Sequence, residues 1–301
     1  MSFSQLLTDA VRAKKNPVLV GLDPRFESLP ESFRSGVAHD DVTRIPAILK
    51  RFCCSIIDIV APLVPAVKPQ SAFFEQYGSF GMIALENVIR YAREQGLLVV
   101  FDGKRNDIGS TAEAYAAGIL GEKSAWGADA MTVSPYLGDD SLEPFVKTAL
   151  ERDAGIFVLV KTSNPGGAML QDLVADGKSV YRHVAEHVQE LALSTKPASE
   201  KYGSIGAVVG ATWPEQLTDL RQIMPSAWFL VPGFGSQGGT AKDVAGAFDS
   251  DGFGAIVNNS RGILYAHREP EFGEDRWEQA VEAATLRMID QLRSETPVGN
   301  I

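Results

Sequence analysis

The chain has 301 residues, of which 45% are hydrophobic and 22% are charged, so it can bury the core of one large α/β domain or of two small ones. Its formal net charge of −10 excludes a general binder of nucleic acids or anionic membranes, because most of its surface would repel a polyanion. A local cluster of lysine and arginine side chains in a cleft could still bind a small anionic substrate.

The first segment of the chain, residues 1–15, lacks the apolar stretch of a signal peptide and predicts a short amphipathic helix. No apolar run approaches the ~20 residues that span a bilayer. The two cysteines, Cys53 and Cys54, are adjacent, and neighbouring cysteines rarely pair and cannot form a CxxC metal motif. They indicate buried thiols on a helix in a reducing compartment, so we expect a cytoplasmic protein.

Eight short apolar runs, rich in β-branched residues, recur along the chain with helix-like stretches between them. Their continuous hydrophobicity is typical of strands that are buried on both faces of a parallel sheet. Eight such units predict a single-domain α/β fold, a (β/α)8 TIM barrel, although a doubly wound sheet would show the same alternation. We expect a long loop at 25–44 and a loose tail after Ser294. The runs are 17–22, 65–67, 97–101, 130–133, 156–160, 205–209, 228–231 and 254–257.

Charged residues follow the first three runs. Asp23 comes after the first run, Lys68 after the second, and Asp102 and Lys104 after the third. In a barrel the carboxyl ends of all strands meet on one face, where the active sites of this fold form. Serine and asparagine are common wherever a strand turns, but charges inside a barrel mouth are costly unless they neutralise one another.

The segment 102–107 carries Asp102, Lys104 and Asp107. Residues two apart on a strand point to the same face, and the apolar residues before Asp102 favour the inward direction for both Asp102 and Lys104. Lys68, on the neighbouring strand, can lie close to Asp102. An alternating array of two lysines and two aspartates keeps all four groups charged. A structural ion-pair network would explain any single pair, whereas four such groups at adjacent strand ends indicate a catalytic site.

A glycine-rich segment, Gly-Phe-Gly-Ser-Gln-Gly at 233–238, follows the seventh run and fits the GxGxxG pattern. A dinucleotide-binding fingerprint would lie near the start of a Rossmann half, with an acidic residue closing the next strand, where this chain has Asn258 and Asn259. The backbone N–H groups of such a loop suit a single phosphate instead, and phosphate sites recur after strands seven and eight of barrels.

Residues 183–187 match the HxxEH pattern of zinc hydrolases. Two histidines four residues apart can share a zinc ion if a further ligand comes from elsewhere. The apolar stripe of the surrounding helix leaves Glu186 on an exposed flank, so a solvated helix face is the simpler interpretation.

The charged residues occur in a fixed order: Asp23, Lys68 and then the motif Asp102-x-Lys104-x-x-Asp107-Ile108. This order resembles the orotidine 5′-phosphate decarboxylase family over nearly the whole chain, and the long spacings are similar to those of a longer bacterial subgroup. The resemblance implies a barrel enzyme that converts orotidine 5′-monophosphate to UMP and carbon dioxide in pyrimidine biosynthesis, with neither a metal nor a cofactor.

The resemblance also implies roles for the charged residues. Lys104 would protonate C6 of the pyrimidine as carbon dioxide leaves, and its charge would stabilise the developing carbanion. Asp102 would lie beside the departing carboxylate and add electrostatic stress to the bound substrate. Lys68 would hold the array and bind the ribose, and Asp23 would bind ribose hydroxyls.

The remaining site residues follow from the same resemblance. Ser163 would contact the pyrimidine, and Gln237 and Arg261 would bind the phosphate, although many family members carry the arginine before the neighbouring serine rather than after it. In the family Asp107 and Thr111 reach into the partner subunit's site, which implies a homodimer with shared active sites.

Other activities stay open at this point. Sugar-phosphate decarboxylases and aldolases of the same barrel superfamily resemble this chain in the DxKxxD segment, but they bind Mg²⁺ with an acidic group after strand two. Lys68 stands at that place here, and its charge would repel a divalent cation. An NAD-dependent oxidoreductase, a zinc hydrolase and a non-catalytic barrel that binds a ligand without turnover are the alternatives from other classes.

Overall fold

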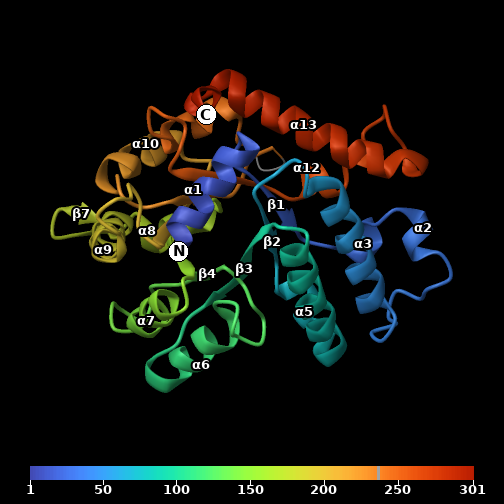
Figure 1. Ribbon diagram of the computed structural model, residues 1–301, viewed down its shortest axis with the longest axis horizontal. Helices are drawn as coiled ribbons and strands as arrows, with labels where there is room; N and C mark the ends of the chain where they lie inside the picture. The colour runs from blue at the N-terminus through green and yellow to red at the C-terminus, as the bar shows by residue number, and fades with distance from the viewer. Residues whose placement is uncertain (236–237) are drawn as a thin grey trace.

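The computed structural model of the protein describes residues 1–235 and 238–301. Over these residues, eight parallel strands close into a barrel in the order β1-β10-β9-β8-β5-β4-β3-β2, with helices around it (Figure 1). The strands are β1 Val18–Leu22, β2 Ala66–Pro69, β3 Leu98–Arg105, β4 Ala130–Val133, β5 Gly155–Lys161, β8 Ile205–Val209, β9 Phe229–Val231 and β10 Ala255–Asn259. The prediction of a (β/α)8 barrel is confirmed, and each of the eight apolar runs forms one of its strands.

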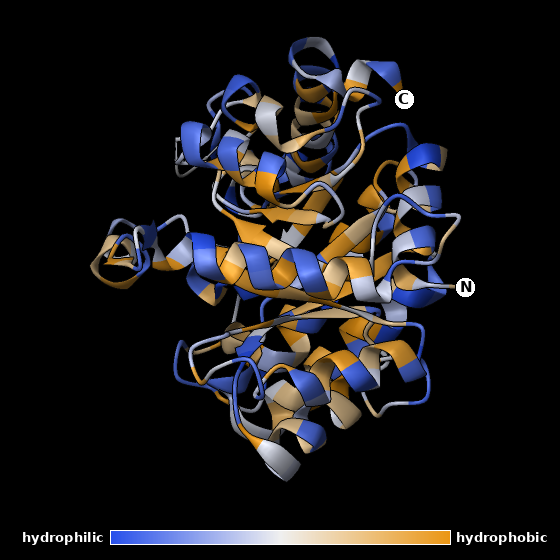
Figure 2. Ribbon diagram, turned by 90° about the vertical axis from the view of Figure 1, so that its left-hand side faces the viewer, coloured by the Kyte–Doolittle hydropathy of each residue, from blue (hydrophilic) through white to orange (hydrophobic). Residues whose placement is uncertain are grey.

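Helices cover the outside of the barrel between successive strands. Figure 2 shows hydrophobic ribbon gathered in the interior and hydrophilic ribbon mainly on the outside. The longer helices are α3 Ile45–Val60, α5 Gly78–Glu94, α6 Gly109–Ile119, α7 Glu143–Glu151, α9 Val180–Thr195, α10 Pro214–Ile223 and α13 Trp277–Glu295. The short ones are α2 Glu31–Arg34, α4 Ala72–Glu75, α8 Ala168–Gln171, α11 Ala241–Val244 and α12 Arg261–Leu264, and a small antiparallel pair, β6 Val174–Ala175 and β7 Lys178–Ser179, lies outside the barrel.

The pattern of buried residues explains how these helices pack. In α3, Leu49, Phe52, Cys53 and Ile56 are buried, which is the spacing of three and four residues that gives a helix one apolar face. Cys53 lies within this face and Cys54 is half-buried beside it, and both thiols are free. The thiols are therefore on a helix, as the sequence indicates.

A separate group of apolar residues fills the barrel interior, where α1 Phe3–Lys14 closes the amino-terminal end. Phe3 packs edge-to-face against Phe157 of β5, with ring centroids 6.0 Å apart, and Leu7 and Val11 are fully buried. The side chain of Ser2 caps the helix by accepting a hydrogen bond from the Gln5 N–H. Because α1 blocks this end, ligands reach the barrel from the carboxyl end of the strands.

The segment 25–44, expected as a long loop, contains a short 3₁₀ turn and α2. Its Phe33 packs edge-to-face against Phe52 of α3 and Trp277 of α13, with ring centroids 5.3 Å apart in both pairs. Phe26 and Leu29 are also buried. Burial of these three side chains holds the segment against the outer helices, and none of its residues, all of which are described, lines the cavity at the barrel mouth.

The chain end differs from the expected loose tail. After α13 ends at Glu295, a 3₁₀ turn at Pro297–Asn300 packs back on the molecule and buries Val298. The side-chain amide of Asn300 donates to the Ser250 carbonyl at 2.9 Å. Within the described ranges, no helix is both long and apolar enough to cross a membrane.

Candidate active site

A cavity of about 440 Å³ opens at the carboxyl end of the barrel. Each barrel strand, or the segment directly after it, contributes to its lining, so the cavity lies on the barrel axis. Its size is that of a site for a nucleotide-sized ligand. Six of the predicted site residues line it: Asp23, Lys68, Asp102, Lys104, Ser163 and Arg261.

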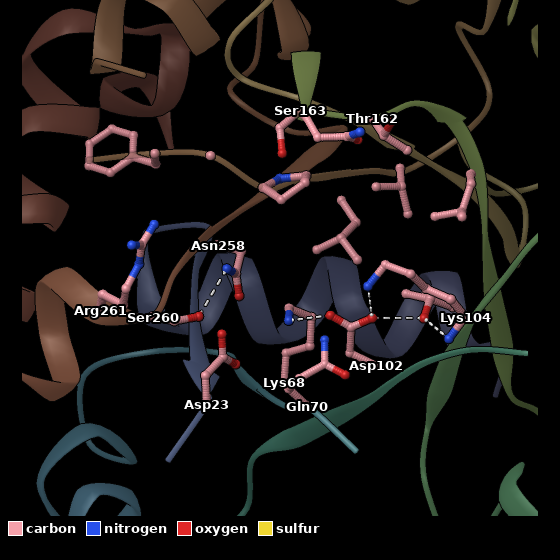
Figure 3. Close-up of a pocket in the computed structure, with 18 residues that line it drawn as sticks. Asp23, Lys68, Gln70, Asp102, Lys104, Thr162, Ser163, Asn258, Ser260 and Arg261 are labelled. Carbon is pink, nitrogen blue, oxygen red and sulfur yellow. Dashed lines mark hydrogen bonds and ion pairs between the residues drawn. The ribbon is translucent and has the colours of Figure 1, made fainter. Parts of the chain in front are cut away.

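Three charged side chains form a continuous array in this cavity (Figure 3). The Lys68 ammonium donates to Oδ2 of Asp102 at 2.6 Å, and the Lys104 ammonium donates to Oδ1 of the same carboxylate at 2.7 Å. The side chains of Lys68 and Asp102 are 5% and 8% exposed, whereas that of Lys104 is 46% exposed. Asp102 thus lies between two cations that both line the cavity, and Lys104 is the more exposed of the two.

The surroundings of this array keep its buried members charged. Burial acts to raise the pKa of Asp102, but the charges of Lys68 and Lys104 and their hydrogen bonds outweigh it, so this pKa lies well below its usual range. Burial acts to lower the pKa of Lys68, yet the charges of Asp102 and Asp23 outweigh it and raise this pKa above its usual value. At neutral pH the buried Lys68 and Asp102 side chains therefore form a charged pair.

Asp102 and Lys104 both face the cavity, but β3 is not a regular strand between them. The pairing of β3 with β4 shifts in register between Phe101 and Arg105, and Lys104 has a left-handed backbone with φ of 45°. The rule that residues two apart share a face assumes a regular strand. It gives the correct direction for the side chains of Asp102 and Lys104, although β3 is irregular at this place.

The fourth member of the array predicted from the sequence is absent from this chain's own cavity. The Asp107 carboxylate accepts a hydrogen bond from the N–H of the next residue, Ile108, at 2.9 Å, and neither Asp107 nor the exposed Thr111 lines the cavity. Asp107 lies between the end of β3 at Arg105 and the start of α6 at Gly109, so its place in the array stays a prediction.

Polar side-chain atoms without a hydrogen-bond partner lie in the cavity wall next to the array. Among the described residues, Oδ1 of Asp23 and Oδ1 of Asn258 are buried without a hydrogen-bond partner, and the Asn258 amide donates only a long bond, 3.4 Å, to Ser260. Figure 3 shows these three side chains on one side of the cavity. Buried polar atoms normally have partners, so these atoms suit a ligand rich in hydroxyl groups.

The position of Asp23 is fixed from a distant part of the chain. The Tyr265 hydroxyl donates to the Asp23 carbonyl at 2.9 Å and accepts from the Arg25 N–H at 2.7 Å, so it clamps the turn on both sides of Pro24. Sequence reasoning missed Tyr265 and Asn258, because neither is charged and Tyr265 is far from the motif along the chain.

The opposite wall follows β5. Ser163 lines the cavity, and its carbonyl accepts a hydrogen bond from Thr212 at 3.0 Å. Lys161, which is buried, forms an ion pair with Asp172, and its ammonium lies 5.0 Å from the ring centroid of Trp213. These contacts hold the segment that follows β5, and with it Ser163, against the next unit of the barrel.

The predicted phosphate-binding end is partly described. Gly233 and Phe234 after β9, and Arg261 at the start of α12, line the same cavity as the charged array. Gly235 has φ of 70°, a left-handed conformation that glycine adopts without strain. Gln237, the other predicted phosphate ligand, lies outside the described residues.

The HxxEH histidines lie elsewhere, on α9. Glu186 forms an ion pair with Lys178 at 2.6 Å, and Nε2 of His183 lies 2.8 Å from the Ala175 carbonyl, so both bind the β6–β7 hairpin. In the part of the chain that the structure describes, no three His, Cys, Asp or Glu residues gather as a metal site.

Comparison with known proteins agrees with this geometry. Residues 17–272 match the model of the orotidine 5′-phosphate decarboxylase / HUMPS family. An orotidine 5′-phosphate decarboxylase of Rhodopirellula baltica is 55% identical, over 97% of this chain and 99% of the relative. One of Caldicellulosiruptor bescii is 40% identical, over 89% and 91%. The structure of Leishmania donovani OMP decarboxylase aligns with a TM-score of 0.77 at 34% identity, over 98% of this chain and 99% of that one. The chain belongs to the orotidine 5′-phosphate decarboxylase / HUMPS family.

Proposed function

We propose that this chain decarboxylates orotidine 5′-monophosphate to UMP and carbon dioxide in pyrimidine biosynthesis, with neither a metal ion nor a cofactor. The observation that carries this proposal is the array in which Asp102 lies 2.6 Å from the Lys68 ammonium and 2.7 Å from that of Lys104, inside a nucleotide-sized cavity. The decarboxylase relatives support it, because they span nearly the whole chain.

The cavity suits this substrate along its whole length. Arg261 and the backbone N–H groups of the glycine-rich loop would bind the phosphate. Asp23 and Lys68 would bind the ribose hydroxyls, since Oδ1 of Asp23 has no partner among the described residues. Ser163, on the β5 side, would contact the pyrimidine. These contacts would bring the pyrimidine C6 and its carboxylate to the array.

The chemistry then needs one acid and one fixed negative charge. As the bond between C6 and the carboxylate breaks, its electron pair stays on C6 and carbon dioxide departs. The Lys104 ammonium stabilises this developing charge and transfers a proton to C6, and water afterwards restores the proton to the lysine. Asp102 repels the bound carboxylate, and departure of carbon dioxide relieves that repulsion.

The family also includes HUMPS proteins, so a metal-dependent sugar-phosphate reaction is the rival. Mg²⁺ binds through carboxylates and water in an octahedral arrangement. Here the Lys68 ammonium contacts Oδ2 of Asp102 directly, so a divalent cation at this place would meet a like charge. We therefore favour the metal-free decarboxylase.

The test is turnover of orotidine 5′-monophosphate by the purified chain in EDTA, with no added cofactor. We expect loss of the substrate absorbance and formation of UMP and carbon dioxide in equal amounts. Folded protein that produces no UMP, or activity that EDTA abolishes and Mg²⁺ restores, would overturn the proposal. Ligand binding without turnover would support the non-catalytic barrel instead.

We also propose that the protein acts in the cytoplasm as a homodimer in which Asp107 and Thr111 complete the partner's site. The two free thiols favour a reducing compartment. Asp107 and Thr111 both lie outside the cavity of their own chain. The neighbouring Ile108 is 57% exposed, and a dimer interface would cover this apolar side chain.

Mixing two inactive variants tests the shared site. Lys104→Ala and Asp107→Ala subunits, once exchanged, would form mixed dimers with one site free of both substitutions, so activity should return. Subunit exchange without any recovery of activity would contradict a shared site.

A further inference from the structure

The register shift in β3 leaves three residues opposite one. Phe101 pairs with Met131 and Arg105 with Val133, so Asp102, Gly103 and Lys104 all face the single residue Thr132 of β4. Such an insertion interrupts the backbone ladder and redirects the side chains that it carries. Lys104 within it has φ of 45°, a left-handed conformation that is unfavourable for a non-glycine residue and persists only where neighbours hold it.

The Thr132 hydroxyl makes the contacts that the interrupted ladder leaves open. Its oxygen accepts a hydrogen bond from the Lys104 N–H at 2.9 Å, and its proton is donated to Oδ1 of Asp102 at 3.0 Å. Thr132 is 1% exposed and its own strand pairs regularly with β5, so the hydroxyl has a fixed position. One hydroxyl group therefore ties the backbone of Lys104 to the carboxylate of Asp102.

Both ends of Lys104 meet at the same oxygen. The ammonium of Lys104 donates directly to Oδ1 of Asp102, and the backbone N–H reaches that oxygen through Thr132. This closed ring of hydrogen bonds fixes the positions of both the backbone and the ammonium group of Lys104. Because 46% of the Lys104 side chain is exposed, packing alone would leave the long side chain several rotamers.

We propose that Thr132 is a positioning residue of the decarboxylase, whose hydroxyl places the Lys104 ammonium for proton transfer to C6. This inference rests on the proposed function, because it concerns the distance between Lys104 and the substrate. Thr132 is itself neutral, and it acts through the charged side chains of Asp102 and Lys104. Near-attack geometry is sensitive to displacements of about 1 Å, so a neutral neighbour can control the rate.

The test compares Thr132→Val with Thr132→Ser. Valine has nearly the shape of threonine but removes the hydroxyl, and serine keeps the hydroxyl and removes a methyl group. We expect Thr132→Val to lower kcat roughly 10- to 100-fold, which corresponds to loss of a hydrogen bond to a charged group, with KM within about twofold of wild type. Thr132→Ser should restore kcat to within about threefold of wild type.

Thr285→Val on α13 is the matched control. Thr285 is fully buried and its hydroxyl donates to the Val281 carbonyl, but it lies outside the cavity. This variant should lose stability and keep kcat. If Thr132→Val does not fold, Thr132→Ala takes its place with the same expected loss of kcat.

Two outcomes would overturn the inference: wild-type kcat in folded Thr132→Val, or an equal loss of kcat in the valine and serine variants, which would assign the effect to packing. Failure of the proposed function looks different, because folded wild-type protein would then produce no UMP at all.

Discussion

Replacing Lys68 by methionine removes one of the two cations that enclose Asp102 while keeping a side chain of similar length. The pair is buried, with the two side chains 5% and 8% exposed and the ammonium 2.6 Å from Oδ2. Removing one partner of a buried ion pair destabilises a protein by about 3–5 kcal/mol, because the remaining charge is left uncompensated. Lys104 still contacts Oδ1 of Asp102 at 2.7 Å, so we expect the lower end, about 3 kcal/mol.

The free energy of unfolding from urea denaturation measures this loss, and the melting temperature should fall by roughly 6–12 °C. Asp102→Asn and the double variant Lys68→Met/Asp102→Asn complete a double-mutant cycle. We expect the double variant to be more stable than Lys68→Met by at least about 1 kcal/mol, since the uncompensated carboxylate is gone. Wild-type stability in Lys68→Met, or strictly additive losses in the cycle, would refute the reasoning.

Three further predictions concern the same cavity. The stability difference between wild type and Lys68→Met should shrink at both pH extremes in a series of urea titrations. The pKa of Asp102 is lowered from 3.8, so the stability that its charge contributes is present above about pH 4 and is lost as the pH falls through the folded-state pKa. The pKa of Lys68 is raised from 10.5, so the stability that its charge contributes is present below that pH and is lost as the pH rises through the folded-state pKa. Tyr265→Phe removes the clamp on the turn that carries Asp23, so steady-state kinetics should show KM raised about 10-fold with kcat within about twofold, and an unchanged KM would speak against the clamp. Lys161→Met breaks the ion pair that holds the segment after β5, so limited proteolysis should cut this segment faster than in wild type, and an equal rate would contradict that role.

The barrel itself could be predicted from the sequence because its physical cause is local. Each strand is buried on both faces and is therefore an unbroken apolar run, which stands out from the amphipathic helices around it. The carboxyl ends of parallel strands meet on one face, so Lys68, Asp102 and Lys104 could be placed together without coordinates.

What the sequence did not indicate depends on contacts between distant segments. The left-handed backbone of Lys104 comes from a shift in strand register, which has no signature in residue types. Tyr265 and Asp23 become neighbours only because β10 closes the barrel against β1. Asp107 was grouped with the array by its distance along the chain, whereas it lies two residues past the end of β3 and does not line the cavity.

The chain end shows the same limit. A short polar segment after a long helix is typical of a frayed terminus. Its order here rests on one apolar side chain, Val298, and on a hydrogen bond from Asn300 to a loop about fifty residues earlier. Neither partner can be recognised before the fold is known.

The central claim is that Lys104 supplies both the charge that stabilises the carbanion and the proton that reaches C6. The most direct test is to measure kcat for orotidine 5′-monophosphate in EDTA, for wild type and for Lys104→Ala. Equal midpoints of urea unfolding would show that the variant is folded. Loss of a general acid and of its electrostatic stabilisation together predicts a fall of at least about 10⁴-fold. A folded Lys104→Ala protein with kcat within tenfold of wild type would contradict the account.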